Sequence, residues 1–215
     1  MVTHSNDTLN ARERILSVAE KVFLEGGFDG VSVRELTEAA GVNVALVNYY
    51  FGGKRKLYLE VLHNCFSKEA ESKCAHLQQA IDPCESPDLR QIVSAYVYSH
   101  LGSDESLSAT QSFLRLLTRQ LAEDDDAIQL LLQQLVLPVH QLLIRSIKQT
   151  CPQLSEQKVS LCITSITGQI FHFIRCPAMS GMLAGISETE GLRQAMAEHI
   201  IEFSLKGIKE EPSCA

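Results

Sequence analysis

The sequence predicts an all-α fold, and three observations support this prediction. Apolar residues recur at helical spacing through most of the 215-residue chain. Glycine and proline interrupt that spacing at a few positions, which are the expected ends of helices. Runs of alternating β-branched residues, which would indicate strands, are few. The first helical stretches form a compact motif, and the later ones form a larger helical body.

The most informative segment begins at Ser32 and predicts two short helices joined by a turn. Ser32 and Glu35 have the spacing of a capping box, in which each side chain accepts the backbone N–H of the other residue. Gly41 supplies the backbone freedom for a turn, and Asn43 is a good N-cap for a second helix over 44–50. These features predict a helix-turn-helix, whose second helix lies in the major groove of DNA.

Further helices are expected on both sides of this motif. Over 12–24 one helical stripe is apolar, and Gly26-Gly27 ends it. A longer helix begins near Lys54, after Gly52-Gly53, and runs to about 77 or 81. The first helix therefore supports the helix-turn-helix, and the longer one connects it to the body.

At this point the sequence resembles the TetR family of bacterial transcriptional regulators. The resemblance runs from Arg12 to Tyr58 and rests on four motifs: R-x-R-I-L-x-x-A-x-x-x-F, G-G-F, S-V-x-x-L-x-x-A-A-G-V-N and Y-Y-F-x-x-K-x-x-L. The body, with F-L-R-L-L and G-Q-I-F-H-F, is similar to the subgroup that carries a CecR-type C-terminal domain. The resemblance implies a DNA-binding domain over 1–54 and a helical effector-binding and dimerisation domain over 55–215.

The body is expected to contain five further helices after a polar turn with two prolines at 82–87. Pro138 lies inside one of them and predicts a kink, because proline has no N–H to donate to the preceding turn. The tail after 206 is polar. The expected helices cover 88–101, 107–122, 124–150, 155–175 and 188–206.

The resemblance implies that DNA bases are contacted by Val44, Ala45 and Asn48. Of these, only Asn48 can make a bidentate contact, and asparagine pairs with adenine N6 and N7. The family more commonly has tyrosine at the position of Asn48, so the operator contacts of better known members do not transfer. A solvated polar position is the alternative interpretation of Asn48.

Phosphate contacts are expected beside the recognition helix. Hydroxyl groups, lysines and the N-terminal N–H groups of helices are suited to phosphate oxygens. The resemblance implies this role for Tyr49 and Lys54, and Ser32 and Val33 at the start of their helix are suited to the same role.

The charge of the chain is unusual for this function. The formal net charge is −7, and the first 60 residues hold seven Lys and Arg against eight Asp and Glu. A basic domain is the usual signature of DNA binding. Local positive charge is confined to Lys54-Arg55-Lys56, and salt screens distant charges over about 8 Å. Use of the helix-turn-helix for protein contact stays open on this ground.

An effector pocket is expected in the body. Arg115 and Arg119 are one turn apart on an otherwise apolar helix, and guanidinium groups bind carboxylates in a bidentate way. They therefore predict an anionic effector, with Phe113 and His172 as further candidates. Structural salt bridges are the alternative for the arginines, and a structural role is the alternative for the histidine.

Several functions are not supported by the sequence. No Gly-rich phosphate loop or catalytic constellation is present, and the seven His and seven Cys show no metal-ligand spacing, so no enzyme, cofactor or metal is expected. The N-terminus lacks an apolar segment, and no run of about 18 apolar residues occurs. A cytoplasmic protein with reduced thiols and no membrane contact is expected.

These observations and the resemblance together predict a ligand-responsive repressor. It would bind a palindromic double-stranded operator as a homodimer through its last two long helices, and release it with a small-molecule effector. The alternative is a helical small-molecule-binding protein or enzyme whose helix-turn-helix is not used on DNA.

Overall fold

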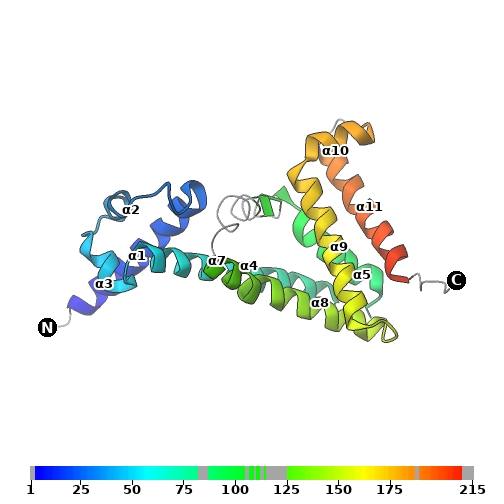
Figure 1. Cartoon of the computed structure of the whole chain (residues 1–215), viewed down its shortest axis with the longest axis horizontal. Coiled ribbons are helices and arrows are strands. Elements are labelled where there is room, and N and C mark those ends of the chain that lie inside the picture. The colour runs from blue at the N-terminus through cyan, green and yellow to red at the C-terminus, as the bar shows by residue number, and fades with distance from the viewer. Residues whose placement is uncertain are drawn as a thin grey trace. The chain divides into compact units, whose positions relative to one another are not determined.

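The structure is a computed structural model that describes residues 3–81, 87–104, 107–108, 110–111, 114, 125–186 and 189–209. Every regular element in these residues is helical, which confirms the predicted all-α fold (Figure 1). The chain divides into two compact units. Unit 1 holds the described residues within 1–69 and 115–135, and unit 2 holds those within 70–114 and 136–215.

Unit 1 is built around its first helix. The helices are α1 (Thr3–Gly26), α2 (Val33–Ala40), α3 (Ala45–Phe51), the first part of α4 (Lys54–Ile81) and α7 (Asp125–Leu131). Helix α1 packs against α2 and α3. The interior is apolar and includes Ile15, Ala19, Phe23, Leu36, Val47, Phe51, Leu57, Tyr58, Val61 and Leu62, all buried.

The predicted local signals of the helix-turn-helix are confirmed. The Ser32 Oγ accepts the Glu35 N–H at 3.1 Å, and the Ser32 N–H donates to the Glu35 carboxylate at 2.8 Å. Gly41 has a φ of 63°, a left-handed conformation that glycine adopts without steric cost. The Asn43 Oδ1 accepts the Ala45 N–H at 2.9 Å. The second helix begins at Ala45, one residue later than expected, so Val44 takes the N-cap position and Asn43 holds the first N–H of the helix from one residue before it.

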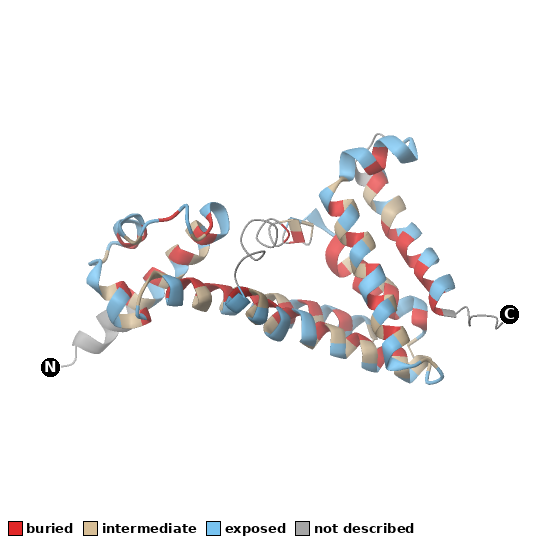
Figure 2. Ribbon diagram, in the orientation of Figure 1, coloured by how far each residue is buried: buried red, intermediate tan, exposed pale blue. Residues whose placement is uncertain are grey.

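Unit 2 is a helical bundle with one central helix. It holds the remainder of α4, then α5 (Leu89–Leu101), α8 (Leu137–Thr150), α9 (Glu156–Arg175), α10 (Pro177–Ala184) and α11 (Thr189–Lys209). Helix α5 packs against α8, α9 and α11, and α9 also packs against α11. Buried residues therefore occupy most of α5, whereas α9 and α11 are buried on one side only (Figure 2).

The region around Pro138 differs from a simple kink. A π-helical turn, Leu132–Val136, precedes α8, and Pro138 occupies the first turn of that helix. Proline has no N–H, so it cannot complete the regular pattern of the preceding turn, and a wider turn accommodates the mismatch. The expected turn at 82–87 and helix at 107–122 lie largely outside the described residues.

Helix α10 was not expected from the sequence. Its segment is short and contains glycine, which disfavours a helix on propensity alone. Pro177 begins the helix, and the buried Ser180 and Gly181 are small. A Cβ at Gly181 would lie 3.1 Å from a methyl of Leu192 on α11. The Ile186 carbonyl oxygen would lie closer still, at 2.9 Å, so only a residue without a Cβ fits at this position.

Two helical segments meet the length and composition of a membrane span. Within the described residues these are the run Asp125–Thr150 and, as a bent pair, α9 with α10. In the first, 28% of the most apolar 18-residue window is buried. Core helices of soluble proteins meet the same criteria. In this run Leu131, Leu135, Val139 and Leu143 recur every fourth residue and are buried, a pattern typical of a helix packed along one side.

A buried polar cluster joins α4, α5 and α9 inside unit 2. The Lys73 Nζ donates to the backbone carbonyl of Ser99 at 3.2 Å, and the Tyr96 hydroxyl lies 2.7 Å from the Thr167 hydroxyl. The His100 Nδ1 lies 3.1 Å from the Tyr96 carbonyl. Burial, assisted by the charge of Lys73, lowers the pKa of His100 to about 3. This imidazole is therefore neutral in the folded protein.

The buried His100 predicts loss of stability in mild acid. Its pKa is lower in the folded chain than in the unfolded chain, where histidine titrates near 6.5. Between pH 6.5 and 3 the unfolded chain binds more protons, so stability falls as pH falls. The wild type should lose about 2 kcal/mol more of its unfolding free energy than His100→Asn between pH 7 and 5, by urea titration.

The exposed His76 provides the matched control for this measurement. The variant His76→Asn should retain the pH dependence of the wild type. An unchanged pH dependence in His100→Asn would show that another group is responsible.

Candidate DNA interface

Helix α3 separates its exposed residues from its core residues. Val47 and Phe51 are buried in unit 1. Val44, Ala45 and Asn48, the three residues expected to contact bases, are all exposed. Because residues four apart lie on the same side of a helix, Asn48 is next to the start of α3 on its surface. The three side chains are therefore accessible together along one side of α3.

Tyr49 carries the most exposed aromatic ring of this helix. Its side chain is 78% exposed, and its ring packs edge-on against that of the half-buried Tyr50 with centroids 5.0 Å apart. This contact limits the positions of the Tyr49 ring while its hydroxyl stays in solvent. A tyrosine in this state is suited to a phosphate oxygen.

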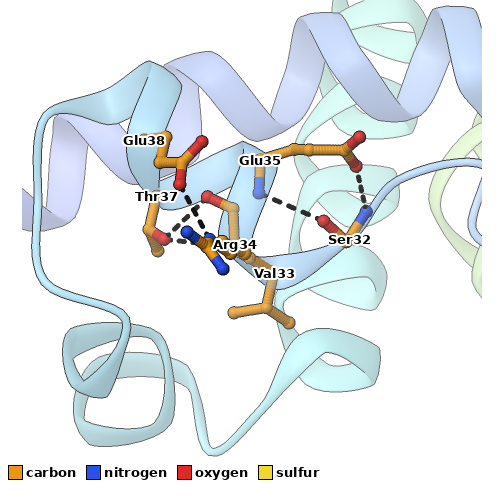
Figure 3. Close-up of polar contacts among 6 residues, drawn as sticks. All are labelled: Ser32, Val33, Arg34, Glu35, Thr37 and Glu38. Atoms are coloured by element: carbon orange, nitrogen blue, oxygen red, sulfur yellow. Dashed lines mark hydrogen bonds and ion pairs between the residues drawn. The ribbon is translucent and has the colours of Figure 1, made fainter.

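The start of α2 presents one hydroxyl and one backbone N–H (Figure 3). The Ser32 N–H is occupied by the Glu35 carboxylate, as the capping box requires. The Ser32 hydroxyl accepts the Glu35 N–H and also interacts with the Glu35 carboxylate. The Val33 N–H is one of the first N–H groups of a helix, which have no partner within it. The Ser32 hydroxyl and the Val33 N–H are the two groups at this helix start that were expected to contact phosphate.

Glu35 opposes an anion at this position. Hydrogen bonds from the Ser32 backbone and then from its hydroxyl lower the pKa of Glu35. The carboxylate is therefore negative at neutral pH and lies beside the two donors. Its charge weakens any phosphate contact made by Ser32 and Val33. Nearby basic residues therefore supply most of the attraction for a phosphate.

Two cations of unit 1 lie over aromatic rings. The Lys54 Nζ is 4.2 Å from the centroid of the Phe28 ring. The Arg12 guanidinium is 5.1 Å from the centroid of the Phe51 ring and also forms an ion pair with Glu60. Contact with a ring holds a cation without neutralising its charge, whereas a carboxylate neutralises it.

Ion pairs divide the basic residues of unit 1 into two groups. Pairs within the described residues are Arg12–Glu60, Arg34–Glu38, Arg55–Asp126 and Lys68–Glu20. Lys54 and Lys56 form no such pair in the described part of the chain. Two members of the expected cluster 54–56 therefore keep their charge available, and the third is paired with α7.

Phe28 and Asp126 were not identified as site residues from the sequence. Phe28 belongs to the G-G-F motif, but nothing in that motif indicates a partner 26 positions later in the chain. Asp126 pairs with Arg55 across 71 positions at 2.8 Å. Both contacts arise from tertiary packing. Spacing along the sequence does not predict contacts between residues so far apart.

The expected effector residues are only partly within the described structure. Phe113, Arg115 and Arg119 lie outside the described residues. His172 is exposed on α9, with its ring centroid 5.8 Å from that of Phe173. Among the described residues, no three His, Cys, Asp or Glu side chains are grouped as metal ligands would be.

Unit 1 also contains an open groove of about 670 Å³ beside α4 and α7. Two of its three carboxylates, Glu60 and Asp126, are already paired with arginines. The lining residues are Leu59, Glu60, His63, Asp125, Asp126, Gln129, Leu130 and Gln133.

Two family models match the chain. Residues 15–61 match the model of bacterial regulatory proteins of the tetR family. Residues 86–208 match the C-terminal domain of CecR, an HTH-type transcriptional dual regulator. The first match contains α2 and α3, and the second extends over most of unit 2.

Curated relatives match over a shorter region. The HTH-type transcriptional repressor NicS of Pseudomonas putida is 30% identical over 89 residues, which are 41% of each chain. The HTH-type transcriptional repressor AcnR of Corynebacterium efficiens is 34% identical over 71 residues, which are 33% of this chain and 38% of that one. The match therefore spans about two fifths of these relatives.

Solved structures share the fold over nearly the whole chain. A protein from Saccharomonospora viridis, assigned as a transcriptional regulator and solved with choline, has a TM-score of 0.65 at 18% identity, covering 90% of this chain and 94% of that one. The TetR family regulator PfmR of Thermus thermophilus has a TM-score of 0.53 at 20% identity, covering 88% and 97%. With an exposed recognition helix and two matching family models, the chain belongs to the TetR family of DNA-binding transcriptional regulators, with a C-terminal domain of the CecR type.

Proposed function

We propose that this regulator is a homodimeric, ligand-responsive repressor of a palindromic operator. The observation that carries the proposal is the surface of α3, where Val44, Ala45 and Asn48 are exposed while Val47 and Phe51 are buried. The names of NicS and AcnR as repressors support repression over activation. A two-fold operator follows from a two-fold dimer, because each recognition helix reads one half-site.

Sequence is read by Asn48 with apolar help from its neighbours. The amide of Asn48 forms a bidentate contact with adenine, and the methyl groups of Val44 and Ala45 contact thymine methyls. Tyr49, Lys54 and the start of α2 bind phosphates and set the position of α3 in the groove. This division assigns specificity to α3 and most of the affinity to the groups around it.

Helices α9 and α11 form the dimer interface in this proposal. The apolar stripe of α9 that contains Ile163 and Ile170 is buried within unit 2, so a partner meets the opposite side. On that side Leu161 is 59% exposed, and small residues such as Gly168 permit close approach of a second helix. On α11, Phe203 is 61% exposed even though its ring stacks on that of His199, and exposed apolar surface of this kind is typical of protein contacts.

Regulation follows from two states of the dimer. In one state the spacing of the two recognition helices does not fit the operator, and an effector that binds this state more tightly releases the protein from DNA. The effector can lower operator affinity by no more than the ratio of its own affinities for the two states. We assign effector binding to the CecR-type C-terminal domain, residues 86–208, and retain Arg115 and Arg119 as candidate ligands for a carboxylate. The choline in the S. viridis structure supports a small-molecule site in this fold.

The relatives are named as regulators rather than enzymes. We extend this to the chain and place its action in the cytoplasm, without a membrane partner, because its operator is there.

Substitutions in the interface should separate specificity from affinity. Asn48→Ala removes the adenine contact, so discrimination at one base position should fall by about 1–3 kcal/mol. Lys54→Ala should weaken binding to all sequences and reduce the salt slope by about 1 for each half-site. Both effects are measured by titration of an operator selected from random DNA, at several salt concentrations around 0.15 M.

The control for these variants is Lys21→Ala, which removes the same charge from α1, where no DNA contact is proposed. Failure of wild-type protein to enrich any sequence at any salt would contradict the proposal. It would favour a helix-turn-helix that is not used on DNA.

Charge placed in the proposed interface should dissociate the dimer. Leu161→Glu combined with Phe203→Glu buries carboxylates against apolar surface, which is strongly unfavourable. Sedimentation velocity should then report a monomer with much weaker operator binding. Leu132→Glu, at a leucine that is 46% exposed in unit 1, should leave the dimer intact. A dimer that persists in the double variant would place the interface elsewhere.

The effector assignment rests on Arg115. Arg115→Ala should retain operator affinity and lose the response to the small carboxylate that releases the wild type, because a bidentate contact is removed. Fluorescence anisotropy of a labelled operator, titrated with a panel of small carboxylates, measures both properties. If the effector releases the Arg115→Ala variant from the operator at the same concentration as the wild type, Arg115 does not bind the effector and its role is structural.

A further inference from the structure

The ammonium group of Lys54 is held by a ring rather than by an acid. Its Nζ lies 4.2 Å from the centroid of Phe28, and Lys54 forms no ion pair within the part of the chain that the structure describes. Lysine has four flexible side-chain bonds, so an unrestrained ammonium group samples many positions. The ring restricts that sampling at the first residue of α4, directly after recognition helix α3.

The Phe28 ring is itself fixed by the core of unit 1. Its centroid lies 5.2 Å from that of Tyr58, and the Tyr58 ring is 1% exposed. Tyr58 also packs edge-on against Phe23 at 5.2 Å. The half-buried Phe28 therefore presents a face whose position is determined by buried aromatic packing on α1 and α4.

Neighbouring arginines have carboxylate partners, although Arg12 also lies over the Phe51 ring. Arg12 and Arg55 are paired with carboxylates of Glu60 and Asp126, which offset their charge. A ring attracts a cation through its quadrupole and leaves the net charge and the outward N–H donors in place. In a chain with net charge −7, a cation positioned without a carboxylate keeps its full attraction for a phosphate.

We propose that Phe28 is a positioning residue for DNA binding, which holds the Lys54 ammonium group ready for an operator phosphate. The inference rests on the proposed function, in which Lys54 contacts that phosphate. Phe28 itself touches no DNA in this assignment. It acts by restricting Lys54 before binding, so that less side-chain freedom is lost when the complex forms.

The first test replaces the ring and keeps the apolar bulk. Phe28→Leu retains contact with Tyr58 and should lower operator affinity about 3- to 10-fold. Phe28→Tyr retains a ring and should bind within about 2-fold of the wild type. The salt slope should stay at the wild-type value in both variants, because Lys54 still reaches the phosphate, whereas Lys54→Ala lowers it.

A double-mutant cycle separates positioning from a structural role. In the Lys54→Ala background, Phe28→Leu should have no further effect on operator affinity, because its effect acts through Lys54. Phe23→Leu is the matched control: it alters the same Tyr58 contact, and any loss it causes should be equal with and without Lys54. Thermal unfolding of each variant reports folding independently.

Should Phe28→Leu fold poorly, fluorinated phenylalanines at position 28 preserve the shape of the ring. Each added fluorine weakens the negative face, so operator affinity should fall stepwise while unfolding temperature changes little. No dependence on fluorination would overturn the inference. So would an equal loss from Phe28→Leu in the presence and absence of Lys54. If the wild type binds no DNA, the proposed function fails and the inference fails with it.

Discussion

The burial of Tyr58 is the constraint on which the DNA-binding unit depends. Its ring, 1% exposed, contacts Phe23 on α1 and Phe28 in the turn after it. These contacts fix the first turns of α4 against α1, and α1 in turn packs on α2 and α3. The position of the recognition helix and of Lys54 therefore follows from aromatic packing in the interior. Changes in that core reach the DNA-binding surface without altering any residue on it.

In this unit, carboxylates pair with some of the basic residues and leave others with their charge unpaired. Glu60, Asp126 and Glu38 pair with arginines, and Glu35 closes the start of α2. Exposed pairs of this kind contribute little stability, about 0–1 kcal/mol each. Their larger consequence is that attraction for phosphate is concentrated where no carboxylate is paired. The overall acidity of the chain is compatible with DNA binding for this reason, since distant charges are screened.

The sequence predicted unit 1 far better than unit 2. The capping box at Ser32, the turn at Gly41 and the cap at Asn43 are local signals, because each bond joins residues at most three positions apart. In unit 2 the expected helix starts at 88 and 155 agree with the structure, where the Asp88 and Ser155 side chains accept N–H groups three residues later. Helix α10 was missed because its glycine lowers the local helix propensity, and the close approach of Gly181 to Leu192 is a tertiary feature that propensity does not include.

What the sequence determined by itself is most of the described helices other than α10, the helix-turn-helix and the family, since short-range caps and apolar spacing encode them. Only the tertiary structure decided which apolar stripes are interior: Ile163 and Ile170 of α9 are buried, whereas Leu161 and Phe203 are exposed. It also decided that Arg55 is paired with a carboxylate, whereas Lys54 rests on an aromatic ring. The physical reason is that burial and charge pairing depend on residues far apart in the chain, as in Arg55 with Asp126 and Lys54 with Phe28.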